Sequence, residues 1–333
     1  MTDRSELAAR FLKGTEWANA KRKPLAGDAS NRRYERLHQP DGTTAVFMDA
    51  PPEKGEDVRP FIAIAEYLSS LGLSAPRIPA RDTDTGFLIL EDLGDDLYAR
   101  VVERSPEIEE TIYVAATDAL IALHRADPPD LKPYDAQIMT DLAATAYTRY
   151  KAGITGVDPK DETAAFIARF RPVLAQLTGG PQVLIQRDYH AENLLWLPDR
   201  AGVARVGMLD FQDAMLGHPA YDLVSILQDA RRDVPVTIEA AMIDHYVRAT
   251  GVEKDGFSAA YAALGTQRNL RILGIFAKLS LDMGKSHYID LIPRVWGLLQ
   301  RDLDHPALGT IASIIRAELP EPTAENLARL KPT

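Results

Sequence analysis

The alternation of apolar and polar positions divides this chain into an early part typical of strands and a later part typical of helices. Four short runs predict strands, at residues 34–38, 44–49, 78–80 and 87–90. Between them, an apolar stripe at helical spacing predicts one amphipathic helix over residues 60–71, with Phe61, Ile64, Ala65 and Leu68 on its buried face. We therefore expect a small sheet with one helix.

After Gly94 the apolar residues recur at the spacing typical of helices. Helices are predicted at about residues 107–126, 137–151, 162–176, 221–230, 236–249, 257–283, 289–304 and 308–318. A β island over residues 183–210 interrupts them, and a short helix capped by Asp3 is expected near the N-terminus. The predicted fold class is α+β, with a small β-rich lobe over residues 1–92 and a larger helical lobe over residues 93–333.

Composition narrows the class of protein. The 333 residues are 46% hydrophobic and 26% charged, as in ordinary globular proteins, and the net charge of −10 argues against a nucleic-acid partner. The chain has no cysteine, which excludes disulfides and thiolate metal sites. The N-terminal segment MTDRSELAAR has no apolar core, and no apolar run reaches membrane-spanning length. We expect a cytoplasmic enzyme that acts as a monomer on a small molecule.

The stretch IQRDYHAENLLW, residues 185–196, places a charged segment between two apolar runs. Asp188 and Asn193 are five positions apart, and Asp210 ends the next apolar run. Carboxylate and amide oxygens suit Mg²⁺, and an Asp that binds no metal can accept a proton from a hydroxyl nucleophile. The simpler alternative is that each of these side chains only caps a turn.

This pattern, Asp188-x4-Asn193 followed by Leu209-Asp210-Phe211, resembles the protein-kinase-like fold. Gln186 and Gln212 depart from the protein-kinase motifs, and the form QRDYHAEN with LDFQD is closer to the aminoglycoside phosphotransferase family. The resemblance implies ATP and Mg²⁺ as cofactors, Asp188 as the base, and Asn193 and Asp210 as metal ligands. In that family Asp222 would anchor the catalytic loop.

The same resemblance assigns roles in the first lobe. The segment GDASNRRY, residues 27–34, would cover the ATP phosphates, with contacts from Ser30, Asn31, Arg32 and Arg33. The backbone of Leu90, Glu91, Asp92 and Leu93 would read adenine. Met48 stands where kinases have a lysine, so we expect Arg32 or Arg33 to supply the missing charge. An ordinary polar hairpin and an inactive pseudokinase are the alternatives.

The acceptor is suggested by a closer resemblance. The runs GDASNRRY, VFMDAPPE and LDFQDA look like those of the anomeric kinases of N-acetylmuramate and N-acetylglucosamine, which make sugar 1-phosphates in cell-wall recycling. The resemblance implies an amino-sugar acceptor phosphorylated at its C1 hydroxyl. An aminoglycoside or choline acceptor and a non-catalytic ATP-binding module remain alternatives. A phosphatase with Asp210 as nucleophile is disfavoured, because the expected Asp-x-Asp pattern is absent.

N-acetylmuramate carries a lactyl carboxylate, so a cation is expected near the acceptor. Arg268, Arg271 and Lys278 lie roughly on one face of the helix predicted over residues 257–283. Arg268 or Arg271 is the candidate for selecting the carboxylated sugar, although a solvated basic stripe on a surface helix is the favoured explanation. His190 and Glu192 are further candidates for contacting the acceptor.

Overall fold

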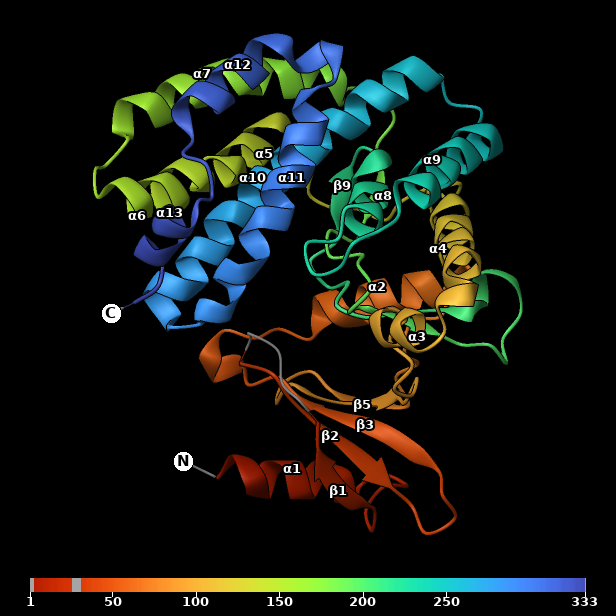
Figure 1. Ribbon diagram of the computed structural model, residues 1–333. Helices are drawn as coiled ribbons and strands as arrows, with labels where there is room; N and C mark the ends of the chain where they lie inside the picture. Colours follow the sequence, from red (N-terminus) through yellow and green to blue (C-terminus); the bar gives the residue numbers. More distant parts are fainter. Residues whose placement is uncertain (1–2, 26–30, 333) are drawn as a thin grey trace. The chain divides into compact units, whose positions relative to one another are not determined.

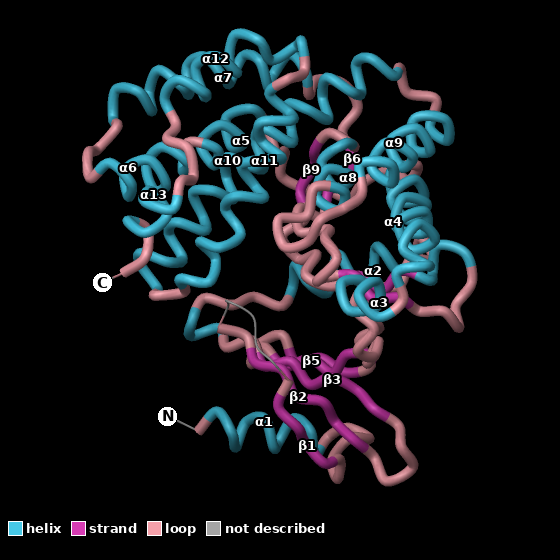
Figure 2. The backbone as a smooth tube through the Cα atoms, viewed as in Figure 1, coloured by secondary structure: helices cyan, strands magenta, loops and turns pink. Residues whose placement is uncertain are grey.

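The computed structural model describes residues 3–25 and 31–332 and divides into two compact units. Unit 1 consists of Met1–Ala126 and Ala191–Ala214, and unit 2 consists of Asp127–His190 and Met215–Thr333. The strands gather in unit 1, whereas unit 2 is mostly helical (Figure 2). The predicted α+β class is confirmed, while the lobe boundary after residue 92 stays a prediction.

Unit 1 is built on a five-stranded antiparallel sheet in the order β1-β2-β3-β5-β4 (Figure 1). The strands are β1 (Lys21–Pro24), β2 (Arg33–His38), β3 (Thr44–Asp49), β4 (Ala80–Asp82) and β5 (Phe87–Glu91). The edge strand β1 was not predicted, because its sequence KRKP is exposed throughout and carries no apolar alternation. The strand expected at residues 78–80 lies instead at β4.

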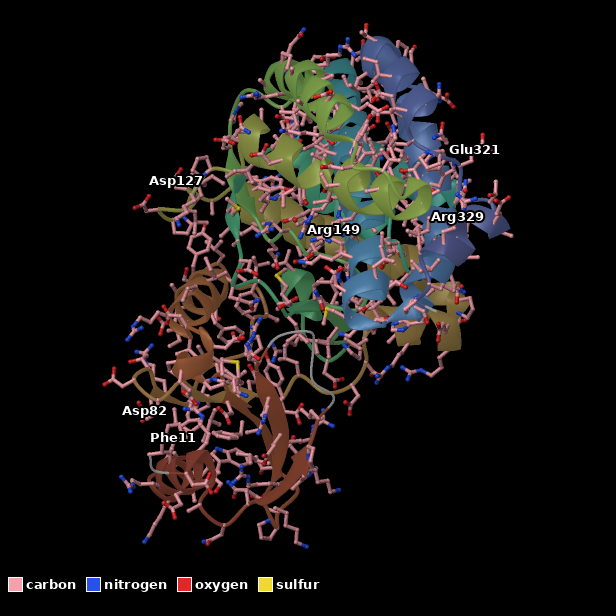
Figure 3. The ribbon with its side chains drawn as sticks, turned by 90° about the vertical axis from the view of Figure 1, so that its left-hand side faces the viewer. Phe11, Asp82, Asp127, Arg149, Glu321 and Arg329 are labelled. Carbon is pink, nitrogen blue, oxygen red and sulfur yellow. The ribbon has the colours of Figure 1, made fainter. Side chains whose placement is uncertain are left out.

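Helix α1 (Arg4–Lys13) covers one face of this sheet and begins at the predicted cap, where Asp3 accepts the Ser5 N–H. Phe11, labelled in Figure 3, packs against Phe47 and Phe87 with ring centroids 6.2 and 5.7 Å apart. These apolar contacts fix the helix to the sheet.

The predicted amphipathic helix is α2 (Arg59–Ser70), and Phe61, Ile64, Ala65 and Leu68 are all buried as expected. Unit 1 also contains α3 (Tyr98–Arg104), α4 (Glu109–His124) and the paired strands β7 (Leu194–Trp196) and β8 (Val206–Met208). Phe61 stacks on Phe211, just after β8, at 4.9 Å between ring centroids. The helix α2 therefore packs against the segment that contains Asp210.

Unit 2 is arranged around the 30-residue helix α10 (Lys254–Met283), which contacts α11 (Ile292–Leu303), α8 (Ala220–Leu227) and α5 (Ala136–Ala143). The other helices are α6 (Ala152–Thr155), α7 (Lys160–Leu177), α9 (Val236–Thr250), α12 (Gly309–Glu318) and α13 (Ala324–Arg329). The helix expected over residues 137–151 is broken, since a π-helical turn at Ala146–Lys151 follows α5. None of the helices in the described ranges combines the length and apolarity that a membrane crossing requires.

The predicted β island is divided between the two units. β6 (Val183–Ile185) pairs with β9 (Met215–Gly217) in unit 2, whereas β7 pairs with β8 in unit 1. The island was expected to end at residue 210, so β9 was missed. Figure 1 shows α8 following β9 directly, which places the start of this helix beside the loop that leaves β6.

Candidate active site

In unit 1, the two predicted metal ligands lie together at one end of a hairpin. Leu194 of β7 is in register with Met208 of β8, and the Leu209 N–H donates to the carbonyl of Asn193 at 2.9 Å. Asn193 Nδ2 lies 3.5 Å from Asp210 Oδ2. Antiparallel pairing thus brings the side chains of Asn193 and Asp210, which are 17 residues apart in sequence, into contact.

Asp210 has an unusual backbone for a residue other than glycine, with φ 58°. Gln212 Nε2 donates a hydrogen bond to Asp210 Oδ1 at 2.8 Å, while Phe211 between them is buried. Strained residues of this kind cluster at functional sites, where the surrounding structure holds them in place. The stacking of Phe61 on Phe211 and the hydrogen bond from Gln212 hold Asp210 in this backbone conformation.

The side chains of Asn193 and Asp210 fit Mg²⁺ chemically. Mg²⁺ is usually held by one or two carboxylates together with substrate phosphates, and an amide oxygen is a further ligand of the same hard type. The amide of Asn193 presents its nitrogen to Asp210, and a half-turn of that amide presents its oxygen instead. The pair could therefore hold a cation that also binds phosphate.

Arg32 is the charged residue of the predicted phosphate-covering segment that lies near Asp210. Its Nη2 is 3.8 Å from Asp210 Oδ1, and its Nε is 3.6 Å from Glu56 Oε2. The Asn31 N–H donates to the other Glu56 oxygen at 3.0 Å. Arg33 is exposed at the start of β2, and Ser30 lies outside the described residues. Glu56 was not predicted to belong to the site, yet its carboxylate contacts both Asn31 and Arg32.

The predicted hinge is fixed by ion pairs at the end of β5. Glu91 pairs with Arg77 at 3.1 Å and with Arg200 at 2.8 Å, and Asp92 pairs with Arg36 at 2.8 Å. The Glu91 N–H also donates to the Arg77 carbonyl at 2.8 Å, so it is already engaged. Leu90 is buried, and a Cβ added to Gly207 would lie 3.2 Å from a Leu93 methyl carbon, so Leu93 packs closely on that strand.

In unit 2, Asp222 holds the loop that leads to Asp188. Its fully buried carboxylate accepts the backbone N–H groups of Gln186 at 2.6 Å and Arg187 at 2.9 Å. Burial raises the pKa of Asp222 to about 7, against the two backbone hydrogen bonds, which lower it. The expectation that Asp222 anchors this loop is confirmed.

The environment of His190 brings several charged residues of unit 2 together. Burial, together with the positive charges of Arg231 and Arg268, lowers the pKa of His190 to about 4, although the negative charges of Asp229 and Asp188 oppose this. The imidazole is therefore neutral at neutral pH. Asp188, His190 and Arg268 thus belong to one charged cluster, together with Asp229.

The favoured explanation of the basic residues on α10, a solvated surface stripe, is wrong for Arg268. This side chain is only 5% exposed, and its Nη2 donates to Ser225 Oγ at 2.8 Å. Arg271 is partly buried, and its Nη1 donates to Tyr221 Oη at 3.3 Å. Lys278 is exposed, as a solvated stripe would have it.

Arg271 and the loop that leads to Asp188 share an aromatic support. The rings of Tyr134 and Tyr221 meet edge to face at 5.0 Å, and the Arg187 guanidinium lies 5.5 Å from the Tyr134 ring centre. Burial acts to lower the pKa of Arg271, but Tyr221, Tyr134 and Asp188 raise it above its usual value, so the group stays cationic. Glu192 belongs to unit 1, where its side chain is exposed.

A family model described as "Phosphotransferase enzyme family" matches residues 21–263. The chain belongs to this family. The match includes the β-sheet of unit 1, the loop held by Asp222 and most of the residues that the sequence singled out, with Arg268 and Arg271 beyond its end. The predicted family is therefore confirmed.

Similar proteins extend this finding over nearly the whole chain. A protein of Caulobacter vibrioides named N-acetylmuramate/N-acetylglucosamine kinase is 40% identical, over 93% of this chain and 95% of that protein. A Pseudomonas aeruginosa protein of the same name is 34% identical, over 90% and 88%. A choline/ethanolamine kinase family protein from Mesorhizobium loti has a similar structure, with TM-score 0.63 and 13% identity over 95% of this chain and all of the other. The predicted kinase-like fold is confirmed.

Some residues of these clusters had no sequence signal. Asp229 stands in the run LQDARRD, which matches no motif, and Glu56 stands in an unremarkable polar loop. Tyr221 directly precedes Asp222, but only Asp222 was given a role. Contacts with distant segments identify Glu56 and Tyr221, and the electrostatic influence of Asp229 on His190 identifies Asp229.

Proposed function

We propose that this protein is an ATP-dependent kinase that phosphorylates N-acetylmuramate and N-acetylglucosamine. The observation that carries the proposal is the 40% identity, along nearly the full length of both chains, to a kinase named for these two sugars. Membership of the phosphotransferase family supports the reaction class. We further propose that the acceptor is the C1 hydroxyl, and that the enzyme is a cytoplasmic monomer.

In this proposal Asp188 accepts the proton of the sugar hydroxyl as that oxygen attacks the γ-phosphoryl group of ATP. Phosphoryl transfer depends chiefly on positioning and on stabilisation of charge. The hydrogen bonds that Asp222 accepts from the backbone N–H groups of Gln186 and Arg187 support this role, because they fix the turn directly before Asp188. Asn193 and Asp210 hold Mg²⁺, which when bound neutralises charge on the ATP phosphates.

Arg32 takes the place of the lysine that is absent at Met48. Met48 is buried in β3 opposite Leu88, so its side chain belongs to the core of the sheet. Arg32 lies within ion-pair distance of both Asp210 and Glu56, and its guanidinium can bind phosphate oxygens. Asn31, Ser30 and the hinge backbone from Leu90 to Leu93 complete the proposed ATP site, and since the Glu91 N–H is engaged, adenine is read by other backbone groups.

The acceptor is bound by residues of the cluster that contains His190. Arg268 supplies the cation expected for a carboxylated sugar, whereas Arg271 is bonded to Tyr221 and supports the catalytic loop. The neutral His190 can donate or accept a hydrogen bond with a sugar hydroxyl. Glu192 stays a further candidate, because nothing in its exposed position assigns it another role.

The proposal is tested by ATP- and Mg²⁺-dependent ADP release with a panel of acceptors: N-acetylmuramate, N-acetylglucosamine, glucose, kanamycin, choline and homoserine. We expect turnover of the two N-acetyl sugars, with phosphorus NMR placing the product phosphate at C1. Turnover of kanamycin or choline alone would overturn the acceptor but keep the kinase. ATP binding without turnover of any acceptor would support a pseudokinase instead.

A further inference from the structure

The end of α8 meets the middle of α10 in unit 2 through two neighbouring hydrogen bonds. Arg268 Nη2 donates to Ser225 Oγ at 2.8 Å, and Asn269 Nδ2 donates to Gln228 Oε1 at 3.0 Å. Asp229 directly follows Gln228, so the clamped side chain of Gln228 fixes its position. Its own carboxylate accepts the Arg231 N–H at 2.8 Å.

Opposite charges are buried in this region. Asp229 and Arg268 are 2% and 5% exposed, and both act electrostatically on the buried His190, as does Asp188. A charge in such a site is poorly screened by solvent, so each of these groups influences any charged ligand nearby. Asp188, the proposed catalytic base, therefore shares the surroundings of His190 with the buried acid Asp229 and the buried cation Arg268.

Arg268 is incompletely satisfied. Its Nε and Nη1 are buried, and neither has a hydrogen-bond partner in the part of the chain that the structure describes. A buried donor without a partner costs free energy, and a buried cation favours an anionic neighbour. Nε and Nη1 of Arg268 can therefore donate hydrogen bonds to the oxygen atoms of a ligand.

We propose that Asp229 is a specificity-determining residue whose negative charge balances Arg268, so that the acceptor site accepts both an anionic and a neutral amino sugar. The inference rests on the proposed function. N-acetylmuramate carries a carboxylate that N-acetylglucosamine lacks. Arg268 without Asp229 would favour the anionic sugar, and Asp229 without Arg268 would disfavour it, because specificity is a difference between two affinities.

Asp229→Asn removes the negative charge and keeps the shape of the side chain. We expect the ratio of kcat/KM for N-acetylmuramate to that for N-acetylglucosamine to rise about tenfold. Arg268→Gln should lower the same ratio, and neither change should alter the KM for ATP by more than about twofold. Asp233→Asn is the matched control, because this acid is exposed and pairs with Arg294 at 2.6 Å.

A merely structural role for Asp229 would reduce activity on both sugars in parallel, and an unchanged ratio in Asp229→Asn overturns the inference. If that variant does not fold, Asp229→Ser tests the same balance, because it removes the same buried negative charge with a smaller side chain. It should raise the ratio several-fold, and no change would again refute the inference. Wild-type enzyme is assayed first: silence on both sugars rejects the proposed function, whereas turnover with unchanged ratios rejects only the role of Asp229.

Discussion

The carboxylate of Asp222 accepts a hydrogen bond from the backbone N–H of Arg187 at 2.9 Å, across 35 residues of sequence. Arg187 adopts φ 72°, a left-handed conformation that costs a non-glycine residue on the order of 1–3 kcal/mol. The residue that precedes the proposed catalytic base is therefore held in a strained turn by a buried acid on α8.

Replacing Asp222 with alanine should destabilise the protein by about 3 kcal/mol, because two buried backbone donors lose their partner. The turn before Asp188 should also relax, so we expect kcat to fall at least about tenfold. Urea unfolding and steady-state kinetics measure the two effects.

Thr323→Ala is the control for this change. Thr323 caps α13 by accepting the Asn326 N–H at 3.2 Å, and it has no contact with the residues around Asp222 among those described. Its loss should cost about 1 kcal/mol and leave kcat unchanged. Equal kinetic effects of the two variants would contradict an anchoring role for Asp222.

Asp188 and Asp210 should respond differently to substitution. Asp188→Asn removes the proton acceptor, so kcat should fall about 10²- to 10⁴-fold while ATP binding persists. Asp210→Asn removes a charged metal ligand, so the Mg²⁺ concentration needed for half-maximal activity should rise. Titration of Mg²⁺ with each variant separates the roles; an altered Mg²⁺ requirement in Asp188→Asn alone would reverse the assignment.

Arg32 and Arg33 are adjacent but differ in environment. Arg32→Ala should raise the KM for ATP about tenfold or more, because a cation near Asp210 is lost. Glu56→Gln should produce a smaller increase, since this side chain positions Arg32 and Asn31. The exposed Arg33 should matter less, and ATP kinetics of Arg33→Ala as impaired as those of Arg32→Ala would contradict the assignment.

The buried Asp302 should make stability depend on pH. Burial raises the pKa of Asp302 to about 8, although bonds from Gln228 and Asn269 and the charge of Arg301 oppose this. The raised pKa means that the folded state retains a proton that the unfolded chain loses near pH 4. The contribution of Asp302 to the free energy of unfolding is therefore complete below pH 4. It is lost as the pH rises through 8, by up to about 1.4 kcal/mol per pH unit.

Asp302→Asn cannot titrate, so its free energy of unfolding should lose this part of the pH dependence. Urea titrations between pH 5 and pH 9 should show the gap between variant and wild type shifting in favour of the variant as the pH rises. Asp304→Asn, at an exposed acid paired with Arg316, should follow the wild-type profile. Parallel profiles for Asp302→Asn and wild type would rule out a protonated Asp302.

Local patterns predicted the elements whose burial is one-sided. The prediction that Phe61 and Leu68 lie on the buried face of α2 was correct. A helix with one face in solvent repeats its apolar residues at helical spacing, and this spacing is visible in the sequence. Asp188, Asn193 and Asp210 were recognisable as candidate site residues because their spacing resembles that of the phosphotransferase motifs. By contrast, β1 and β9 were missed, since each is short and depends on a partner strand for its conformation.

The sequence by itself predicted the family, through its resemblance to known motifs, and the fold class, through its apolar periodicity, and it singled out Asp188, Asn193 and Asp210 as candidates for phosphoryl transfer. Only the tertiary structure decided the environment of α10. Gln267, Arg268 and Asn269 form a polar run that suggests a solvated face, yet all three are buried. Their partners Tyr134, Ser225 and Gln228 come from other segments, and a buried polar residue is stable only where distant groups satisfy it.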